Sequence, residues 1–531
     1  MRTVTACVVA TVLLALALVA PDPVTAVAPA VPTNIRLTWS DDPKTTQTIG
    51  WSTDASVTTG TVQYGRPGQP SLTVTAPAPV ALLTNVGGIN LFSATLRDLQ
   101  PGTQYTYRVG NEGNWSEGYT FATEHASAAR FTFLVFGDSH EKKPVYAVWG
   151  TTATHAYQQN PAARFVMSVG DLIYAGKDYG QWQAWFAACQ RVIAQIPDMP
   201  VIGDHEPRGV TSDQQWQRPE YFVKLFTVPQ NGPADLKGEV YSFDYGFAHI
   251  AVLNSSITYE FAEPARRQAM LQTQAAWLDA DLGATLKPWK IVVYHDSTYN
   301  LVPDRSGTLT KITFGPVLDK HHVDVVFNGH DHGMARSFYI RNEEFVRSAA
   351  EGTVYYVSGR TGDNVKDSLG PKAWHPFYYD PQEKTGYLAV DVDEHVLAIT
   401  MKLEDGTTID RLTINKARPE ESTPVVPFGA YKSVRFAAFG SVLPFGRPPV
   451  QNAAGEWFVD IRALAAYMSG TFDATTNVFA YKGGEIQLQL ANDMFLEAAK
   501  EMVSLAGLRS VGFYCKYHNA MNMVMVERWR D

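Results

Sequence analysis

The chain has 531 residues, a formal net charge of −9, 45% hydrophobic residues and 18% charged residues. Such values are typical of an ordinary globular protein with room for several domains. They give no sign of the strongly basic surface that a nucleic-acid-binding protein needs, so no nucleic-acid partner is expected.

The N-terminus has the pattern of a secretory signal. Arg2 supplies a positive charge, and residues 7–20 form an apolar run that is short for a membrane span. Val24-Thr25-Ala26 offers small residues at a cleavage site. The pattern predicts a signal peptide over residues 1–26 and a secreted or cell-surface protein with no membrane-spanning segment after cleavage. An uncleaved anchor is the alternative.

Residues 31–123 have an all-β pattern. Apolar and polar residues alternate over 35–39 and 48–51, and Gly, Pro and Asp clusters separate such runs. A turn at Pro101-Gly102 precedes an alternating strand. The spacing predicts an immunoglobulin-like or fibronectin III-like sandwich.

Strands and helices alternate from residue 130 to residue 415, which predicts an α/β sandwich. In such a sheet, ligands gather beyond the carboxyl ends of the strands. The expected strands are 131–136, 165–169, 290–294 and 323–327, with a hairpin over 241–254. The expected helices are 145–159, 181–196, 264–282 and 313–320.

Residues 416–428 have the composition of a linker, and residues 429–531 are expected to form a small α+β domain. Its expected helices are 461–468 and 495–506. After signal cleavage the chain keeps Cys189 and Cys515, which the boundaries place in different domains. Two cysteines do not make a disulfide framework, so two buried free thiols are expected. An interdomain disulfide between them is the alternative.

Five short motifs place Asp or His directly after apolar, β-branched runs. If these runs are strands, their ends bring carboxylates and imidazoles to one place, as a two-metal hydrolytic site requires. The motifs are Gly137-Asp138-Ser139-His140, Gly170-Asp171-Leu172-Ile173-Tyr174, Gly203-Asp204-His205-Glu206, Tyr294-His295 and Gly329-His330-Asp331-His332.

The two Asp residues after neighbouring strands allow one carboxylate to bind one ion and another to bridge two. Carboxylates with imidazoles suit Fe, Mn or Zn better than Ca or Mg. The residues expected around the first ion are Asp138, His140, Asp171, Tyr174 and His332. Those expected around the second are Asp204, His295 and His330, with one of Asp138 and Asp171 bridging the two ions.

Two such ions polarise a phosphoryl oxygen and activate a shared water, whose hydroxide attacks phosphorus. His205 is the candidate that protonates the leaving alkoxide or stabilises the transition state. Glu206 is expected to orient His205 or a backbone turn, and Asp331 to form a structural hydrogen bond. Arg305 and His375 are candidates to contact a phosphate or a leaving group. For each the stronger expectation is a structural one, namely that Arg305 is exposed and that His375 is packed in the protein.

The five motifs resemble those of calcineurin-like metallophosphoesterases, and among these the purple acid phosphatases through Gly170-Asp171-Leu172-Ile173-Tyr174. The N-terminal region is similar to the fibronectin-like domain of those enzymes through Val62-Gln63-Tyr64-Gly65 and Trp115-Ser116-Glu117. The resemblance implies a four-layer αββα sandwich over 130–415 and a secreted, acid phosphatase-like enzyme. It also implies a dinuclear centre of Fe with Fe, Zn or Mn, and a phosphorylated small-molecule substrate.

Two positions depart from the purple acid phosphatase pattern, which usually has Gly where His140 stands and Asn where Asp204 stands. That pattern supplies two Asp and a tyrosinate. Here three Asp and a neutral His140 give the same ligand charge without Tyr174. We therefore hypothesise that Tyr174 is no metal ligand, so that the tyrosinate-to-iron colour is absent.

Residues 429–531 resemble the copper amine oxidase N-terminal-like domain of many secreted Gram-positive proteins, through segments 455–464 and 470–477. The resemblance implies no copper site and allows contact with the cell surface. Two other functions stay open for the whole chain. They are a phosphodiesterase or phospholipase-type metallohydrolase, and a non-catalytic cell-surface binding protein.

Overall fold

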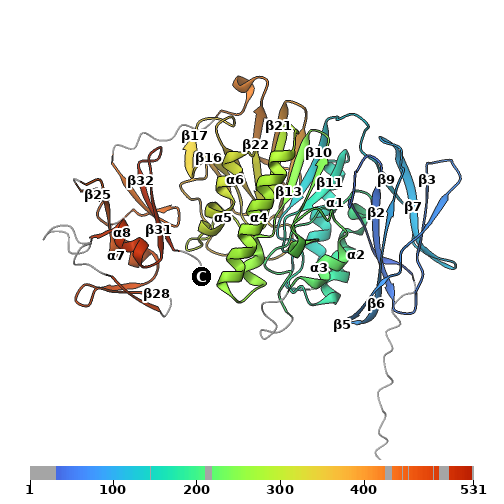
Figure 1. Cartoon of the computed structure of the whole chain (residues 1–531), viewed down its shortest axis with the longest axis horizontal. Coiled ribbons are helices and arrows are strands. Elements are labelled where there is room, and N and C mark those ends of the chain that lie inside the picture. The colour runs from blue at the N-terminus through green and yellow to red at the C-terminus, as the bar shows by residue number, and fades with distance from the viewer. Residues whose placement is uncertain are drawn as a thin grey trace, which may run out of the picture.

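The computed structural model describes residues 31–143, 145–209, 218–424, 433–444, 446–452, 454–481, 484–488 and 502–528. Figure 1 shows three parts in a row, with a β-sandwich and a smaller C-terminal part at opposite ends of a central α/β part. The predicted signal peptide lies outside the described residues. Within these residues, the structure has no helix with the length and apolar character of a membrane span.

Two antiparallel sheets form the N-terminal part, which confirms the predicted β-sandwich. They enclose one core, in which the rings of Trp51 and Phe92 stack with their centroids 5.2 Å apart. The sheet orders are β1-β2-β6-β5 and β4-β3-β7-β8, with β9 paired to β7. The strands are β1 (Thr33–Thr38), β2 (Gln47–Asp54), β3 (Thr61–Gly65), β4 (Leu72–Thr75), β5 (Val80–Thr84), β6 (Gly87–Leu96), β7 (Gln104–Asn111), β8 (Asn114–Trp115) and β9 (Tyr119–Ala122).

Two further sheets form the central part. One has the order β11-β10-β20-β21-β22, and the other has the order β12-β13-β14-β15-β18-β16-β17 with β19 paired to β16. Their strands are β10 (Phe131–Phe136), β11 (Ala163–Ser168), β12 (Tyr241–Tyr245), β13 (Ala248–Val252), β14 (Trp289–Val293), β15 (Val325–Asn328), β16 (Met334–Arg341), β17 (Glu344–Val346), β18 (Thr353–Ser358), β19 (Phe377–Tyr379), β20 (Gly386–Val392), β21 (Val396–Leu403) and β22 (Thr408–Asn415).

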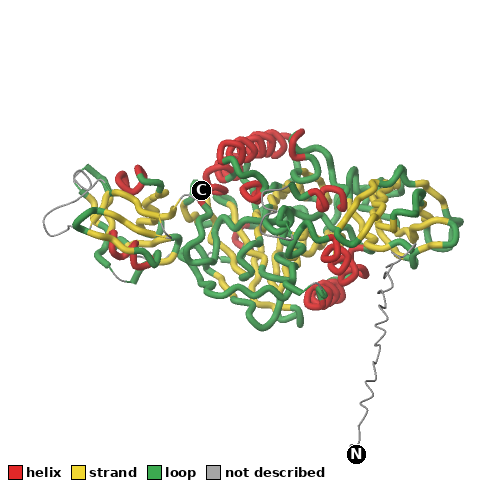
Figure 2. Tube along the Cα trace, turned by 90° about the horizontal axis from the view of Figure 1, so that it is seen from below, coloured by secondary structure: helices red, strands yellow, loops and turns green. Residues whose placement is uncertain are grey.

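Helices lie on two opposite sides of these strands, as Figure 2 shows. Helix α2 begins at an Asp178 cap that accepts from the Gly180 amide, and it buries residues three and four apart, such as Trp182, Trp185 and Cys189. This buried stripe therefore sets which face of α2 packs into the protein, against α1 and β1. The helices are α1 (Ala147–Gln159), α2 (Tyr179–Ile193), α3 (Glu220–Leu225), α4 (Pro264–Ala284), α5 (Thr308–Thr313) and α6 (Gly315–Lys320).

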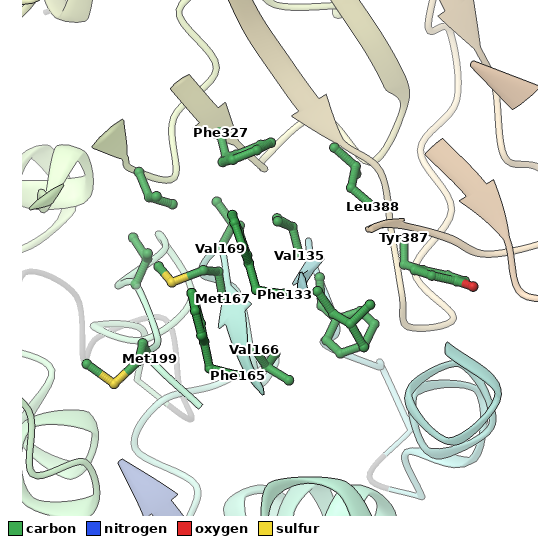
Figure 3. Packing of buried hydrophobic residues seen from close by; sticks show 14 of the residues in the cluster. Phe133, Val135, Phe165, Val166, Met167, Val169, Met199, Phe327, Tyr387 and Leu388 are labelled. Carbon is green, nitrogen blue, oxygen red and sulfur yellow. The ribbon is translucent and has the colours of Figure 1, made fainter. Parts of the chain in front are cut away.

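Aromatic side chains fill the space between the two central sheets. Phe133 of β10 and Phe165 of β11 stack with ring centroids 4.8 Å apart, and Phe327 of β15 meets Phe133 edge-on (Figure 3). Burying such a ring contributes about 1.5–3 kcal/mol each. This shared core fixes the two sheets face to face, so that the loops after their parallel strands meet at one edge.

Strands β10 and β11 are parallel, as are β13, β14, β15 and β18, so their carboxyl ends point one way. Four of the five motifs follow named strands, as predicted. The third does not. The segment before Asp204 runs extended beside β11, with the amides of Met199 and Val201 donating to Val166 and Ser168. It places Asp204 where a strand end was expected.

The C-terminal part contains three small sheets and two short helices among its described residues. Residues 461–467 form the first expected helix, whereas the second, expected over 495–506, lies mostly outside the described residues, and residues 502–504 are a strand. Its elements are β23 (Arg435–Ala438), β24 (Ser441–Val442), β25 (Val450–Gln451), β26 (Trp457–Asp460), α7 (Ile461–Tyr467), β27 (Thr471–Asp473), β28 (Val478–Tyr481), β29 (Gly484–Gln487), β30 (Met502–Ser504), α8 (Leu505–Ser510), β31 (Phe513–His518) and β32 (Met523–Arg528).

Cys189 and Cys515 are buried free thiols, so the expected absence of a bond between them is confirmed and the interdomain bridge is not formed. Cys189 lies in α2 of the central part, and Cys515 lies in β31 of the C-terminal part.

A buried histidine ties helix α4 to the hairpin of β12 and β13. Both ring nitrogens of His249 lie 2.8 Å from carboxylates, Nδ1 from Asp244 and Nε2 from Asp281. Burial lowers the pKa of His249, but the hydrogen bonds to the two carboxylates outweigh this and raise it to about 9. The charged imidazole therefore stabilises the fold fully below the unfolded pKa of about 6.5 and loses this effect as the pH rises through about 9.

We expect His249→Gln to destabilise the protein by about 2 kcal/mol at pH 6 and by much less at pH 10. Denaturant unfolding of both proteins at the two pH values measures this. A destabilisation of the same size at both values would show that lost packing, rather than lost charge, is responsible.

Candidate metal centre

Seven of the predicted ligands converge in two groups that share one carboxylate. Within each group, ligand atoms lie within 4.8 Å of one another, and every residue is buried. Asp171 belongs to both groups, so of the two candidate Asp residues it is the one placed between the two groups. The first group is Asp138, His140, Asp171 and His332, and the second is Asp171, Asp204, His295 and His330.

Backbone carbonyl groups orient two of the imidazoles. Nδ1 of His295 lies 2.7 Å from the Val169 oxygen, and Nδ1 of His332 lies 2.6 Å from the Asn364 oxygen. A carbonyl oxygen only accepts hydrogen bonds, so Nδ1 carries the proton and Nε2 is left with a lone pair for an ion. Nε2 of His295 lies 3.3 Å from Asp171, and Nε2 of His332 lies 3.4 Å from Asp138.

Four of the ligands have strained backbone conformations. The φ angles are +46° at Asp138, +53° at Asp171, +71° at His330 and +60° at His332. Residues with side chains rarely occupy this left-handed region, and strain of this kind collects at functional sites where the surrounding fold enforces it. The surrounding fold therefore holds these four residues in backbone conformations that they would not favour on their own.

Glycine is required where the motifs approach one another. Gly170 has φ +83°, and a Cβ there would lie 2.6 Å from Nδ1 of His295. A Cβ on Gly203 would lie 2.2 Å from a carboxylate oxygen of Asp171. The glycine that opens each of these motifs therefore makes room for the ligand of another motif.

Glu206 holds two of the motifs together through their backbones. Its carboxylate accepts hydrogen bonds from the amides of Asp171, Leu172 and Gly203. Burial, with the charge of Asp171 adding to it, raises the pKa of Glu206 to about 8. The expectation that Glu206 orients a backbone turn agrees with these bonds, and the turn is the one that carries Asp171.

Burial dominates the electrostatics of the first group. It raises the pKa of Asp138 well above its ordinary value, with the like charge of Asp171 contributing. Burial also lowers the pKa of His140 and of His332 well below the ordinary value of histidine. The imidazoles are therefore neutral, which is the form that binds a metal.

The carboxylates of the second group keep their charge. Burial raises the pKa of Asp204, but His330 and His295 outweigh it and hold the pKa well below its ordinary value. Burial and the charge of Asp204 also raise the pKa of Asp171. His295 and His205 outweigh both effects and hold this pKa below its ordinary value. Burial together with Arg305 lowers the pKa of His330 to about 4.

The residues fit two metal ions. Three carboxylates lie buried together with four imidazoles. Burial lowers the pKa of His295, but Asp171 and Asp204 outweigh it and hold the pKa well above its ordinary value, so the buried carboxylates favour positive charge between them. Among the described residues, Asp138 Oδ2 and His140 Nδ1 are buried with no hydrogen-bond partner. Ligand atoms that surround one ion at about 2.1 Å lie about 3 Å apart. The 2.8 Å between His330 Nδ1 and Asp204, and the 3.3 Å between His295 Nε2 and Asp171, match this spacing.

Tyr174 lies next to His205 and Arg208. Its ring lies 5.0 Å from the ring of His205, and the guanidinium of Arg208 sits 5.6 Å from its centre. The structure thus places Tyr174 beside the centre, in contact with two polar neighbours. That Tyr174 is no ligand stays a prediction.

We expect Tyr174→Phe to retain the metal content of the protein and its visible absorption spectrum, because three Asp and a neutral His140 supply the ligand charge without the tyrosine hydroxyl. Metal analysis and spectra of iron-loaded protein measure this. Strong visible absorption that disappears in the variant would identify Tyr174 as a ligand.

His205 lies against the first group with one nitrogen free. Its Nδ1 is 2.6 Å from the Tyr174 carbonyl oxygen, so Nδ1 carries a proton and Nε2 faces Asp171 at 3.8 Å. The ring lies 4.2 Å from that of His140. The imidazole is thus held at the edge of the centre, where it can contact a substrate.

The remaining sequence candidates have structural contacts. Asp331 accepts from the Leu301 amide at 2.6 Å and pairs with Arg305, whose Nη1 also lies 3.1 Å from the carbonyl oxygen of His330. Arg305 is mostly buried, so the exposed Arg that was expected is not found. His375 is packed, as expected, and its Nε2 lies 3.0 Å from the Tyr299 oxygen.

Sequence reasoning missed three residues that support the centre. Lys366 Nζ donates to the His330 oxygen at 2.6 Å, and the Asn364 amide lies 2.6 Å from Nε2 of His140. Asp296 accepts from two serines and lies 3.6 Å from Nε2 of His330. Asn364 and Lys366 follow β18, a parallel strand, so the rule that sites gather at strand ends was the signal available for them.

Comparison with known families agrees with this site. Residues 32–123 match the purple acid phosphatase N-terminal domain, and residues 131–334 match the calcineurin-like phosphoesterase domain. The chain therefore carries both domains, and it is a metal-dependent phosphoester hydrolase.

Similar proteins include purple acid phosphatases of plants. The chain is 24% identical over 405 residues to "Fe(3+)-Zn(2+) purple acid phosphatase 12" of Arabidopsis thaliana, covering 72% of this chain and 83% of that protein. It is 29% identical over 260 residues to a purple acid phosphatase of Glycine max, covering 47% of this chain but only 53% of the relative. A purple acid phosphatase from yellow lupin (Lupinus luteus) seeds shares the fold, with a TM-score of 0.60, 17% identity and coverage of 75% and 78%.

Proposed function

We propose that the protein hydrolyses phosphate esters of small molecules at a centre of two metal ions, in the manner of an acid phosphatase. The observation that carries this proposal is the pair of buried Asp and His groups that share Asp171. Asp138, His140 and His332 would complete the site of one ion, and Asp204, His295 and His330 that of the other. Bound there, the ions supply the charge that polarises a phosphoryl oxygen and lowers the pKa of a nucleophilic water.

His205 is proposed as the catalytic acid or the residue that stabilises the transition state. The Tyr174 carbonyl holds its ring so that Nε2 faces Asp171, where a substrate oxygen would enter. An imidazole at this position donates a hydrogen bond or a proton to the leaving oxygen. Iron paired with iron, zinc or manganese is the proposed metal content, because the donors mix carboxylates with imidazoles.

Hydrolysis of aryl phosphate monoesters and diesters by the purified protein, with its metal content measured, tests the proposal. We expect two ions per chain and faster hydrolysis of monoesters. Faster hydrolysis of diesters, or of phospholipids, would replace the acid phosphatase assignment with a phosphodiesterase. Metal-free protein that stays inert after reconstitution would favour a non-catalytic binding protein.

Secretion is a further part of the proposal. It is supported by the signal pattern of residues 1–26. The likeness of residues 429–531 to the copper amine oxidase N-terminal-like domain, and a contact of that part with the cell surface, stay predictions. N-terminal sequencing of protein from the culture medium tests cleavage after Ala26.

A further inference from the structure

A cavity of about 500 Å³ adjoins the second group of ligands. His330 and Asp296 line the part that lies next to the metal centre. The apolar side chains Leu271, Leu309 and Ile312 line much of the remainder, together with polar residues such as Gln268 and Thr258. A cavity of this size and mixed lining is typical of a small-molecule site.

One segment of the chain, residues 303–311, forms a wall of this cavity. Arg305, Gly307 and Leu309 face it, as do Ser306 and Thr310. Arg305 also reaches the backbone of His330 and the carboxylate of Asp331, as described above. The segment therefore connects the lining of the cavity to the turn that carries two of the ligands.

The other residues of segment 303–311 contact the C-terminal part. The hydroxyl of Tyr467 in α7 donates to the Pro303 carbonyl at 2.8 Å. The hydroxyl of Tyr481 lies 3.2 Å from a carboxylate oxygen of Asp304.

A buried ion pair completes this contact. The Glu527 carboxylate of β32 accepts from Nζ of Lys311 and from the hydroxyl of Thr308, each at 2.9 Å. Lys311 is 5% exposed and Glu527 is 1% exposed, so removing one partner would leave a buried charge unpaired. Figure 1 shows α5, which begins within this segment, between the C-terminal strands and helix α4.

We propose that the cavity beside His330 receives the leaving group of the phosphoester, and that this subsite depends on the C-terminal part. The C-terminal part holds segment 303–311, which forms one wall of the cavity, in place. The proposal rests on the proposed function for the identity of the ligand. It assigns as substrates phosphoesters with a bulky, partly apolar leaving group. Tyr467 and Glu527 are positioning residues, since they act through the segment and do not contact the substrate.

Binding of two non-hydrolysable phosphonates to the metal-loaded, full-length protein tests the proposal. Naphthylphosphonate reaches into the cavity, whereas methylphosphonate needs the metal centre alone. We expect Tyr467→Phe to raise the Kd of naphthylphosphonate about three- to tenfold, as the loss of one hydrogen bond allows, and to leave that of methylphosphonate unchanged. Glu527→Gln should act in the same direction.

Tyr514→Phe is the matched control. The Tyr514 hydroxyl also bonds across to the central part, but its partner there is Glu343 and not a residue of segment 303–311. We expect no change in either Kd. An equal change in Tyr514→Phe, or an equal weakening of both phosphonates in Tyr467→Phe, would overturn the role of the C-terminal part.

Leu309→Trp tests the cavity directly and leaves the interface intact. A larger side chain there should weaken naphthylphosphonate at least about tenfold and spare methylphosphonate. Unchanged binding of naphthylphosphonate would overturn the leaving-group subsite. Because binding needs no turnover, a protein that binds both phosphonates but hydrolyses no ester would contradict the proposed function and leave this result standing.

Discussion

Asp171→Asn should abolish hydrolysis, with a loss in kcat/KM of about a thousandfold or more, and should empty both metal positions. Asp171 is the one residue common to the two ligand groups, and its carboxylate keeps its charge despite complete burial. An amide of the same shape removes that charge from both groups at once. Metal analysis after gel filtration, together with the rate of aryl phosphate hydrolysis, measures the two effects.

Asp204→Asn is the matched control, because it makes the same chemical change in a residue of one group only. The purple acid phosphatase pattern has Asn at this position. We therefore expect the first ion to stay bound and the affinity for the second to fall about 10- to 100-fold. Equal losses in the two variants would show that Asp171 does not bridge.

His205→Gln should lower kcat about 10²- to 10⁴-fold while metal content stays at the wild-type level. His205 borders the ligand groups and belongs to neither of them. Because a proton donor matters most for a poor leaving group, the loss should be larger for an alkyl phosphate than for p-nitrophenyl phosphate. Steady-state rates with the two substrates measure the difference.

His155→Gln, which changes an exposed histidine of α1, should leave both rates unchanged. Equal losses with the two substrates in His205→Gln would assign His205 to transition-state stabilisation alone. Loss of metal from that variant would contradict its placement outside the ligand set.

The sequence was sufficient to predict which seven residues come together in the two groups, because each sits in a short motif at the end of an apolar run. Glycines at 170 and 203 belong to the same pattern, since the close approach of the motifs excludes a Cβ there. The β-sandwich and the α/β order followed from periodicity in the same way. The prediction of a strand before Asp204 was wrong, because that segment donates hydrogen bonds to β11 but does not form a regular strand.

The motifs could not predict contacts between segments that are far apart in the sequence. Lys366 and Arg305 both bond to the His330 carbonyl, yet neither stands in a recognisable pattern near it. The pairing of Lys311 with Glu527 joins positions 216 residues apart, and only the docked surfaces bring them together. Helix α5 was also missed, because six residues are too few to show a helical period.

Metal titration of the stripped protein, with phosphatase activity followed at each addition, distinguishes hydrolysis by two ions from hydrolysis by one. We expect two ions bound per chain and activity that rises as the second site fills, since both groups are needed to hold and polarise the substrate. Full activity with one ion per chain, or hydrolysis by metal-free protein, would contradict a two-metal phosphoester hydrolase.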